Sequence, residues 1–130
     1  GIVLVTSGPG ATNTVTPVRD AMADSIPMIV ICGQVGRSSI GTDAFQEAPI
    51  TSVMGSVAKH VFLVTDEEKL EATMRAAFEI ATSGRPGPVV VDVPKDIQTA
   101  IIQPDANKKI KHLLVQRTID SYRAKHLKSG

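Results

Sequence analysis

Residues 2–10 read Ile-Val-Leu-Val-Thr-Ser-Gly-Pro-Gly, and this stretch decides the fold class. Its apolar half is continuous and rich in β-branched residues, which predicts a short strand buried on both faces, as in a parallel sheet. Gly8-Pro9-Gly10 ends the strand, and a helix is expected over residues 11–23. Pro17 lies inside that helix and favours a later start, with the proline in the first turn.

The same alternation continues along the chain. Further strands are predicted at residues 27–33, 59–64 and 88–93, and helices at residues 45–54 and 65–82, the second opening on a Thr65–Glu68 capping box. Strands that alternate with helices predict an α/β fold, a doubly wound parallel sheet with helices on both faces. Ligands of such sheets bind outside the carboxyl ends of the strands. The loops expected there are residues 7–13, 34–47 and 95–98.

The composition bounds the class of protein. A chain of 130 residues is large enough for one domain, and its single cysteine, Cys32, excludes an internal disulfide framework. No apolar run reaches the roughly 18–20 residues that a membrane span needs. The charge is uneven: residues 1–104 carry 7 Lys+Arg and 11 Asp+Glu, whereas residues 105–130 carry 7 and 2, so the net charges are −4 and +5.

This asymmetry divides the chain into residues 1–103 and a basic tail, residues 104–130, in which one helix over residues 108–128 is predicted. A basic helix can contact nucleic acid or an anionic membrane. Charge runs are more often solvated faces, and a truncated or altered reading frame explains the tail equally well. We therefore expect neither nucleic acid nor a membrane as a partner.

Several loops carry side chains suited to a ligand. Two glycines in Ser7–Asn13 allow a sharp turn and a close approach of a ligand, although a plain strand-to-helix turn explains them as well. Gln46 can donate and accept hydrogen bonds at the edge of a heteroaromatic ring, and Phe45 is either a pocket wall or a core aromatic. Arg85 favours phosphate or carboxylate, and otherwise it is a solvated turn residue. The side-chain chemistry of these loops therefore predicts an α/β ligand-binding domain and nothing more specific.

Four motifs point to one family: T-S-G-P-G-A-T-N (6–13), G-Q-V (33–35), G-T-D-A-F-Q-E (41–47) and S-G-R-P-G-P-V-V-V-D-V-P-K-D-I-Q (83–98). In their order and spacing, residues 1–103 resemble the large catalytic subunit of acetolactate synthase, or acetohydroxyacid synthase, a family of thiamine-diphosphate enzymes. The resemblance implies a fragment of the N-terminal, pyrimidine-binding domain. It also implies thiamine diphosphate, FAD and Mg²⁺ as cofactors. The implied reaction decarboxylates pyruvate and condenses the product with a second 2-oxo acid, the first common step of branched-chain amino acid biosynthesis.

The resemblance extends to partners and location. The active site of the family forms between two catalytic subunits, so a homodimer or higher oligomer is implied, and a regulatory subunit is a candidate partner. The implied location is the cytoplasm in a bacterium, or a plastid or mitochondrion in a eukaryote.

Carried over residue by residue, the resemblance implies two sets of site residues. Cofactor contacts are expected from Gln46, Gly8, Pro9 and Asn13 on the thiamine side and from Arg85 toward FAD. The substrate channel is expected to include Ala44, Phe45, Ser25, Lys59 and Lys95. The glutamate with which the family protonates the aminopyrimidine ring would lie upstream of Gly1, and the Mg²⁺ ligands lie in another domain, so no catalytic or metal-binding residue is expected here. Gly36 stands where the family usually has proline, which loosens the loop.

Two alternatives remain open. A non-catalytic α/β module of this fold could bind a partner subunit, or the Gly8–Asn13 turn could hold a nucleotide-like ligand, although the turn has no P-loop lysine. On the leading hypothesis the isolated chain is a fragment without carboligase activity. A missing first strand and helix would leave an unpaired sheet edge, and we therefore expect the isolated chain to associate or to be poorly soluble.

Overall fold

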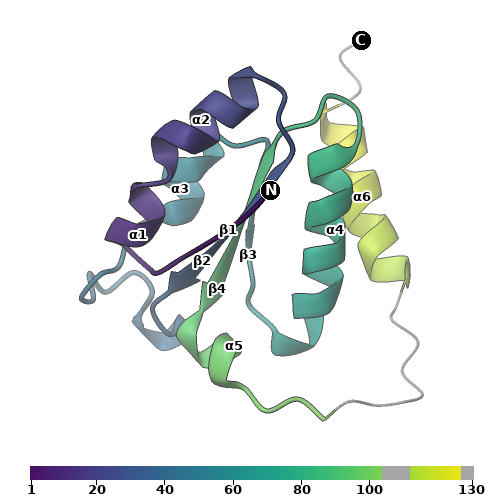
Figure 1. Ribbon diagram of the computed structural model, residues 1–130. Helices are drawn as coiled ribbons and strands as arrows, with labels where there is room; N and C mark the ends of the chain where they lie inside the picture. Colours follow the sequence, from purple (N-terminus) through teal and green to yellow (C-terminus); the bar gives the residue numbers. More distant parts are fainter. Residues whose placement is uncertain (104–111, 127–130) are drawn as a thin grey trace.

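A computed structural model describes residues 1–103 and 112–126 (Figure 1). The described chain folds into one parallel sheet between two layers of helices. The elements in chain order are β1 (Ile2–Val5), α1 (Pro9–Thr12), α2 (Val15–Ala23), β2 (Met28–Gln34), the 3-10 helix η1 (Arg37–Ser39), α3 (Ile50–Gly55), β3 (His60–Leu63), the 3-10 helix η2 (Glu67–Lys69), α4 (Leu70–Thr82), β4 (Pro88–Pro94), α5 (Lys95–Thr99) and α6 (His112–His126).

The strands of the described sheet follow the order β1-β2-β4-β3, and every neighbouring pair is parallel. The register pairs Leu4 with Ile31, and Cys32 with Asp92. Helices α1, α2 and α3 lie on one face of the sheet and α4 lies on the other (Figure 1). The α/β fold predicted from the sequence, with a parallel sheet and helices on both faces, is confirmed in the described residues.

The β-branched strands supply a core on both faces of the sheet. β4 lies between β2 and β3 and is buried at every residue, as a continuous valine run predicts. Its successive residues alternate between the faces: Val89 and Val91 pack toward Ile80 of α4, whereas Val90 packs with Val18 and Met54 on the α2 and α3 side.

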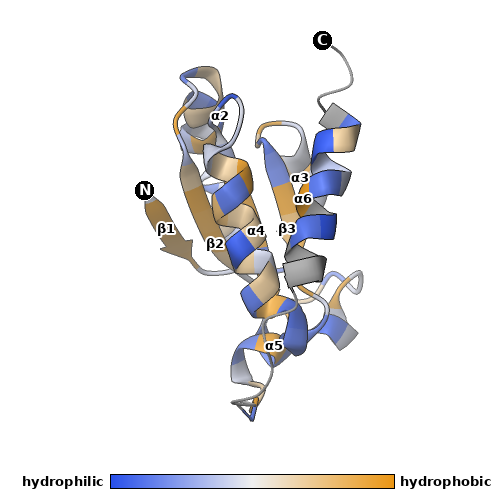
Figure 2. Cartoon of the chain, turned by 90° about the vertical axis from the view of Figure 1, so that its right-hand side faces the viewer, coloured by the Kyte–Doolittle hydropathy of each residue, from blue (hydrophilic) through white to orange (hydrophobic). Residues whose placement is uncertain are grey.

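The sequence predicted that β1 is buried on both faces, but one of its faces is exposed. Ile2 and Leu4 are 62% and 77% exposed, whereas Val3 and Val5 are half-buried against the α2 and α3 layer. α4 packs against β2, β3 and β4, and it leaves the same face of β1 uncovered (Figure 2). The prediction is wrong for this face because burial depends on a covering helix, which a strand's own composition does not supply.

The helix starts follow from local hydrogen bonding. Pro17 is the third residue of α2, where its missing N–H removes no helix bond, so the later start is confirmed. Asp66 caps the turn leading into α4 by accepting a hydrogen bond at 3.0 Å from the Glu68 N–H, so the predicted Thr65 cap is wrong. α3 starts at Ile50, five residues after the predicted start at residue 45.

α6 lies beside α4 (Figures 1 and 2). Ile119 is buried, the Tyr122 and His60 rings meet edge to face with centroids 5.3 Å apart, and Arg123 lies 3.4 Å from Glu79. The other residues of the predicted tail helix, 108–111 and 127–128, fall outside the described part of the chain. None of the helices in the described ranges has both the length and the apolar character needed to cross a bilayer.

Candidate functional site

Three loops meet at the carboxyl edge of the sheet, at the lower end of the view in Figure 1. They follow β1, β2 and β4. The edge carries seven of the predicted site residues: Gly8, Pro9 and Asn13 after β1, Ala44, Phe45 and Gln46 after β2, and Lys95 at the start of α5. These positions are the ones that a parallel sheet offers to a ligand.

The loop after β1 touches the loop after β2 through Gly8 and Gln46. Gly8 is buried with a φ of 54°, and a Cβ built there would lie 2.9 Å from the carbonyl carbon of Gln46 and nearer still to its oxygen. Gln46 has a φ of 60°, and a left-handed backbone in a non-glycine residue costs on the order of 1 kcal/mol. The two loops therefore form one unit in which a strained residue is held against a turn that admits only glycine.

Glu47 closes the Gly41–Glu47 loop. Its carboxylate accepts hydrogen bonds from the Gly41 N–H and, at 3.0 Å, from the Ala44 N–H, instead of capping the next helix. The closed loop presents Phe45 to solvent with 90% of its surface exposed, whereas Ala44 is half-buried. The interpretation of Phe45 as a core aromatic is therefore wrong for this chain.

A buried polar group beneath the same edge was missed from the sequence. Asp92 is 1% exposed and accepts a hydrogen bond at 3.1 Å from Gln34 Nε2, which also donates to the Ala48 carbonyl at 3.2 Å. Cys32 Sγ lies 3.7 Å from Asp92 Oδ1. The signals were an acid inside a run of valines and the glutamine of G-Q-V, but only the β2–β4 pairing brings them together.

Burial dominates the acid–base behaviour of this group. Desolvation raises the pKa of Asp92 to about 6, and the hydrogen bonds from Gln34 and Cys32 offset it only in part. Desolvation together with the neighbouring carboxylate raises the pKa of Cys32 to about 12. The thiol therefore stays protonated at neutral pH and acts as a small buried side chain.

Arg37 links three loops at the carboxyl edge, and no local sequence signal marks it. Its Nε donates to Asp96 Oδ2 at 2.6 Å, its backbone N–H donates to Asp96 Oδ1 at 3.0 Å, and its Nη1 donates to the Thr65 carbonyl at 2.6 Å. Glu67 adds an ion pair at 3.6 Å. The hydrogen bonds from Arg37 hold the pKa of Asp96 below its usual range.

The remaining predicted site residues, Ser25, Lys59 and Arg85, lie at the opposite, amino edge of the sheet. Arg85 donates to the Met22 and Ala23 carbonyls at 2.9 Å and to Ser25 Oγ at 2.7 Å, so it covers the C-terminal end of α2. Lys59 Nζ donates to the Ile80 and Ser83 carbonyls at the end of α4. The structure does not bring these residues together with the Gly8–Gln46 unit, and both cations satisfy helix carbonyls, which is a stabilising use of charge.

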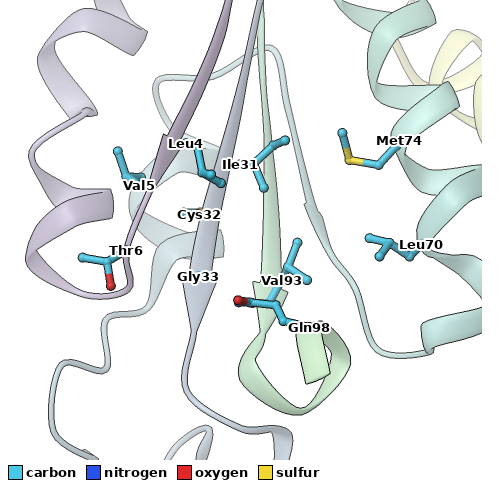
Figure 3. Close-up of a pocket in the computed structure, with 10 residues that line it drawn as sticks. All are labelled: Leu4, Val5, Thr6, Ile31, Cys32, Gly33, Leu70, Met74, Val93 and Gln98. Atoms are coloured by element: carbon cyan, nitrogen blue, oxygen red, sulfur yellow. The ribbon is translucent and has the colours of Figure 1, made fainter. Parts of the chain in front are cut away.

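An apolar groove of about 550 Å³ lies on the α4 face of the sheet (Figure 3). Leu4 and Ile31 line its sheet side, and Leu70 and Met74 of α4 line the other side. Thr6 and Gln98 give it a polar end near the carboxyl edge. The groove coincides with the uncovered face of β1, and it holds none of the site residues predicted from the sequence.

The carboxyl edge carries groups that can contact a neutral heteroaromatic ring. Gln46 and Asn13 are exposed amides that both donate and accept hydrogen bonds, and Gly8 allows the two loops to close on each other. Within the described ranges, His, Cys, Asp and Glu form no group of three that could hold a metal ion. The residues present thus suit the aminopyrimidine part of thiamine diphosphate.

Comparisons with known proteins show which family the chain is similar to. Residues 1–55 match the family model described as thiamine pyrophosphate enzyme, N-terminal TPP binding domain. The chain is 59% identical over 103 residues to the mitochondrial acetolactate synthase catalytic subunit of Saccharomyces cerevisiae, an alignment that covers 79% of this chain and 15% of that protein.

Two further relatives extend the similarity. The chloroplastic acetolactate synthase of Arabidopsis thaliana is 56% identical over 105 residues, which cover 81% of this chain and 16% of the relative. The mitochondrial acetolactate synthase of Schizosaccharomyces pombe is 48% identical over 123 residues, with 88% and 18% covered. The chain therefore spans between 15% and 18% of the length of these relatives.

Proposed function

We propose that this chain, which is homologous to the catalytic subunits of acetolactate synthase, forms the aminopyrimidine side of a thiamine-diphosphate site in such an enzyme. The observation that carries the proposal is the contact between the Gly8 turn and the strained Gln46 loop at the ligand edge of the sheet. The proposed reaction of the whole protein is decarboxylation of pyruvate and condensation of the two-carbon unit with a second 2-oxo acid. This reaction opens branched-chain amino acid biosynthesis.

Each residue of the carboxyl edge has a role in this proposal. Gln46 and Asn13 pair with the ring heteroatoms, while Gly8 and Pro9 shape the turn against which the ring lies. Ala44 and Phe45 line the substrate channel, and Lys95 attracts the carboxylate of a 2-oxo acid. The 90% exposure of Phe45 supports a surface that is covered in the complete enzyme.

The cofactors and partners follow from the same proposal. Thiamine diphosphate, when bound, acts as the electron sink for decarboxylation, and this chain orients it and excludes water from it. FAD, Mg²⁺, a second catalytic subunit and a regulatory subunit belong to the proposed whole enzyme. Two of the relatives are named mitochondrial and one chloroplastic, which supports an organelle as the location in a eukaryote.

The amino-edge residues have a separate place in the proposal. Arg85 uses Nε and Nη2 for the cap on α2, so the donors at Nη1 can contact FAD without loss of the cap. Ser25 and Lys59 are proposed to border a second part of the channel that other segments of the enzyme complete. The hydrogen bonds that hold Lys59 to the end of α4 fix the position of its charge.

A segment exchange tests the proposed function. Residues 1–103 of this chain replace the matching segment of the Saccharomyces catalytic subunit, to which they are 59% identical, and acetolactate formation from pyruvate is measured. We expect an active hybrid that requires added thiamine diphosphate. The matched control is the corresponding exchange with the Arabidopsis segment. A folded but inactive hybrid beside an active control would overturn the proposal.

Gln46 variants of the hybrid then test the site itself. We expect Gln46→Ala to raise the thiamine diphosphate concentration needed for half-maximal activity, because a ring-pairing amide is lost. Gln103→Ala makes the same change at an exposed position beyond the end of α5 and serves as the control. Equal cofactor requirements in the two variants would remove Gln46 from the site.

A further inference from the structure

One carboxylate holds both the backbone and the side chain of Arg37. The two carboxylate oxygens of Asp96 accept hydrogen bonds from the Arg37 backbone N–H and from Arg37 Nε. The Asp96 carboxylate therefore cannot rotate to break one of these hydrogen bonds without distorting the other. Asp96 is the second residue of α5 and directly follows Lys95. The pair therefore ties the segment that leads into the Gly41–Glu47 loop to the element that carries Lys95.

The third contact of Arg37 reaches the loop before α4. Its Nη1 donates to the Thr65 carbonyl, adjacent to the Asp66 cap. Three connections after three different strands, β2, β3 and β4, are thus held by one side chain at the carboxyl edge. A planar guanidinium with fixed donor directions can set such a geometry, which a flexible lysine ammonium cannot reproduce.

The contacts of Arg37 with Asp96 and Thr65 fix the relative positions of the loops more than they stabilise the fold. The Arg37 and Asp96 side chains are 41% and 40% exposed, and ion pairs with this exposure contribute little to the free energy of folding. The residue before Arg37 is Gly36, whose Cβ position is open, with Asp96 Oδ1 as its nearest neighbour at 3.9 Å. Because a glycine leaves the loop backbone free, the position of the loop depends on the next anchored residue, which is Arg37.

We propose that Arg37 is a positioning residue that sets the separation between Lys95 and the Ala44–Gln46 part of the substrate channel. The proposal rests on the function inferred above. Arg37 acts through Asp96 and Thr65 and does not need to touch substrate. Its loss lets the loop that carries Ala44, Phe45 and Gln46 drift relative to α5 while the sheet and the core remain.

The first test uses this chain alone and measures hydrogen exchange of the backbone amides of residues 37–42. We expect Arg37→Ala to speed exchange several-fold and Arg37→Lys to give an intermediate rate. Arg75→Ala is the matched control, because Arg75 forms an exposed ion pair with Glu71 at 2.9 Å on α4, away from this edge. Unchanged exchange in Arg37→Ala overturns the proposal.

The second test uses the hybrid synthase. We expect Arg37→Ala to raise the KM for pyruvate several-fold with a smaller loss of kcat, because the channel is altered and the amount of folded enzyme is not. A purely structural role would lower the amount of active enzyme, and thus apparent kcat, at constant KM. An active hybrid whose Arg37→Ala and Arg75→Ala forms share one KM refutes the positioning role and leaves the proposed function standing. An inactive parent hybrid refutes the proposed function and the channel role together, while the exchange rates still decide whether Arg37 holds the loop.

Discussion

Replacement of Asp92 by asparagine should remove a specific pH dependence of stability. Asp92 is 1% exposed, and burial raises its pKa from 3.8 to about 6. An acid whose pKa is higher in the folded state binds a proton first in that state as the pH falls. The wild-type chain therefore gains stability from this group as the pH falls from about 6 to about 4, and it loses that gain as the pH rises again.

The size of the effect follows from the shift. With about 1.4 kcal/mol per pH unit, and with the unfolded carboxyl still partly ionised at pH 4, Asp92 should contribute about 2–3 kcal/mol between pH 8 and pH 4. Asparagine keeps an oxygen that can accept the hydrogen bond from Gln34 but does not titrate. The free energy of unfolding of Asp92→Asn should thus lack this contribution.

The assay is urea denaturation followed by far-UV circular dichroism, since the chain has no tryptophan. Both forms are unfolded at pH 4, 5, 6, 7 and 8, and the difference between them removes the titration of other groups that they share. Asp20→Asn makes the same chemical change on the exposed surface of α2 and is the control. A difference that is flat across this range, or that grows in favour of the wild type at high pH, would refute the reasoning.

Four further predictions concern the loops, the sheet edge and the activity of the isolated chain. Gly84→Ala should lose about 1 kcal/mol of stability from its positive φ, and Gly8→Ala should lose more, because its methyl also overlaps the Gln46 backbone. Only Gly8→Ala should weaken thiamine diphosphate binding in the hybrid enzyme, and equal cofactor affinity in the two variants would contradict this. Gly36→Pro should raise the free energy of unfolding by about 0.4–1 kcal/mol, because its φ of −56° suits proline and its Cβ has room, and a loss of stability would count against it. Leu4→Lys should reduce self-association of the isolated chain in sedimentation velocity, since Leu4 is 77% exposed on an edge strand. A parent chain that sediments as a monomer would contradict the expected association. The purified 130-residue chain should form no acetolactate from pyruvate, and detectable product would show that it holds a complete site.

The strands, their parallel class and the position of the ligand edge could be predicted from the sequence because they depend on local chemistry. Continuous β-branched runs favour strands whatever surrounds them, and glycine and proline end those strands wherever they occur. The convergence of Gly8, Gln46 and Lys95 on one edge needs only the rule that parallel strands end on the same side. The motifs that indicated the family are likewise local runs of residues.

The tertiary structure alone decided which residues meet, because those contacts join segments that lie far apart along the chain. Asp92 and Cys32 are neighbours only through the β2–β4 register, and Arg37 reaches Asp96 only because both loops leave the same edge. Arg85 reaches the carbonyls at the end of α2, and Lys59 reaches those at the end of α4, only because the fold brings these distant segments together. The exposure of Leu4 also depends on the tertiary structure. An apolar strand favours burial, but its side chains lose contact with water only where another element packs against them.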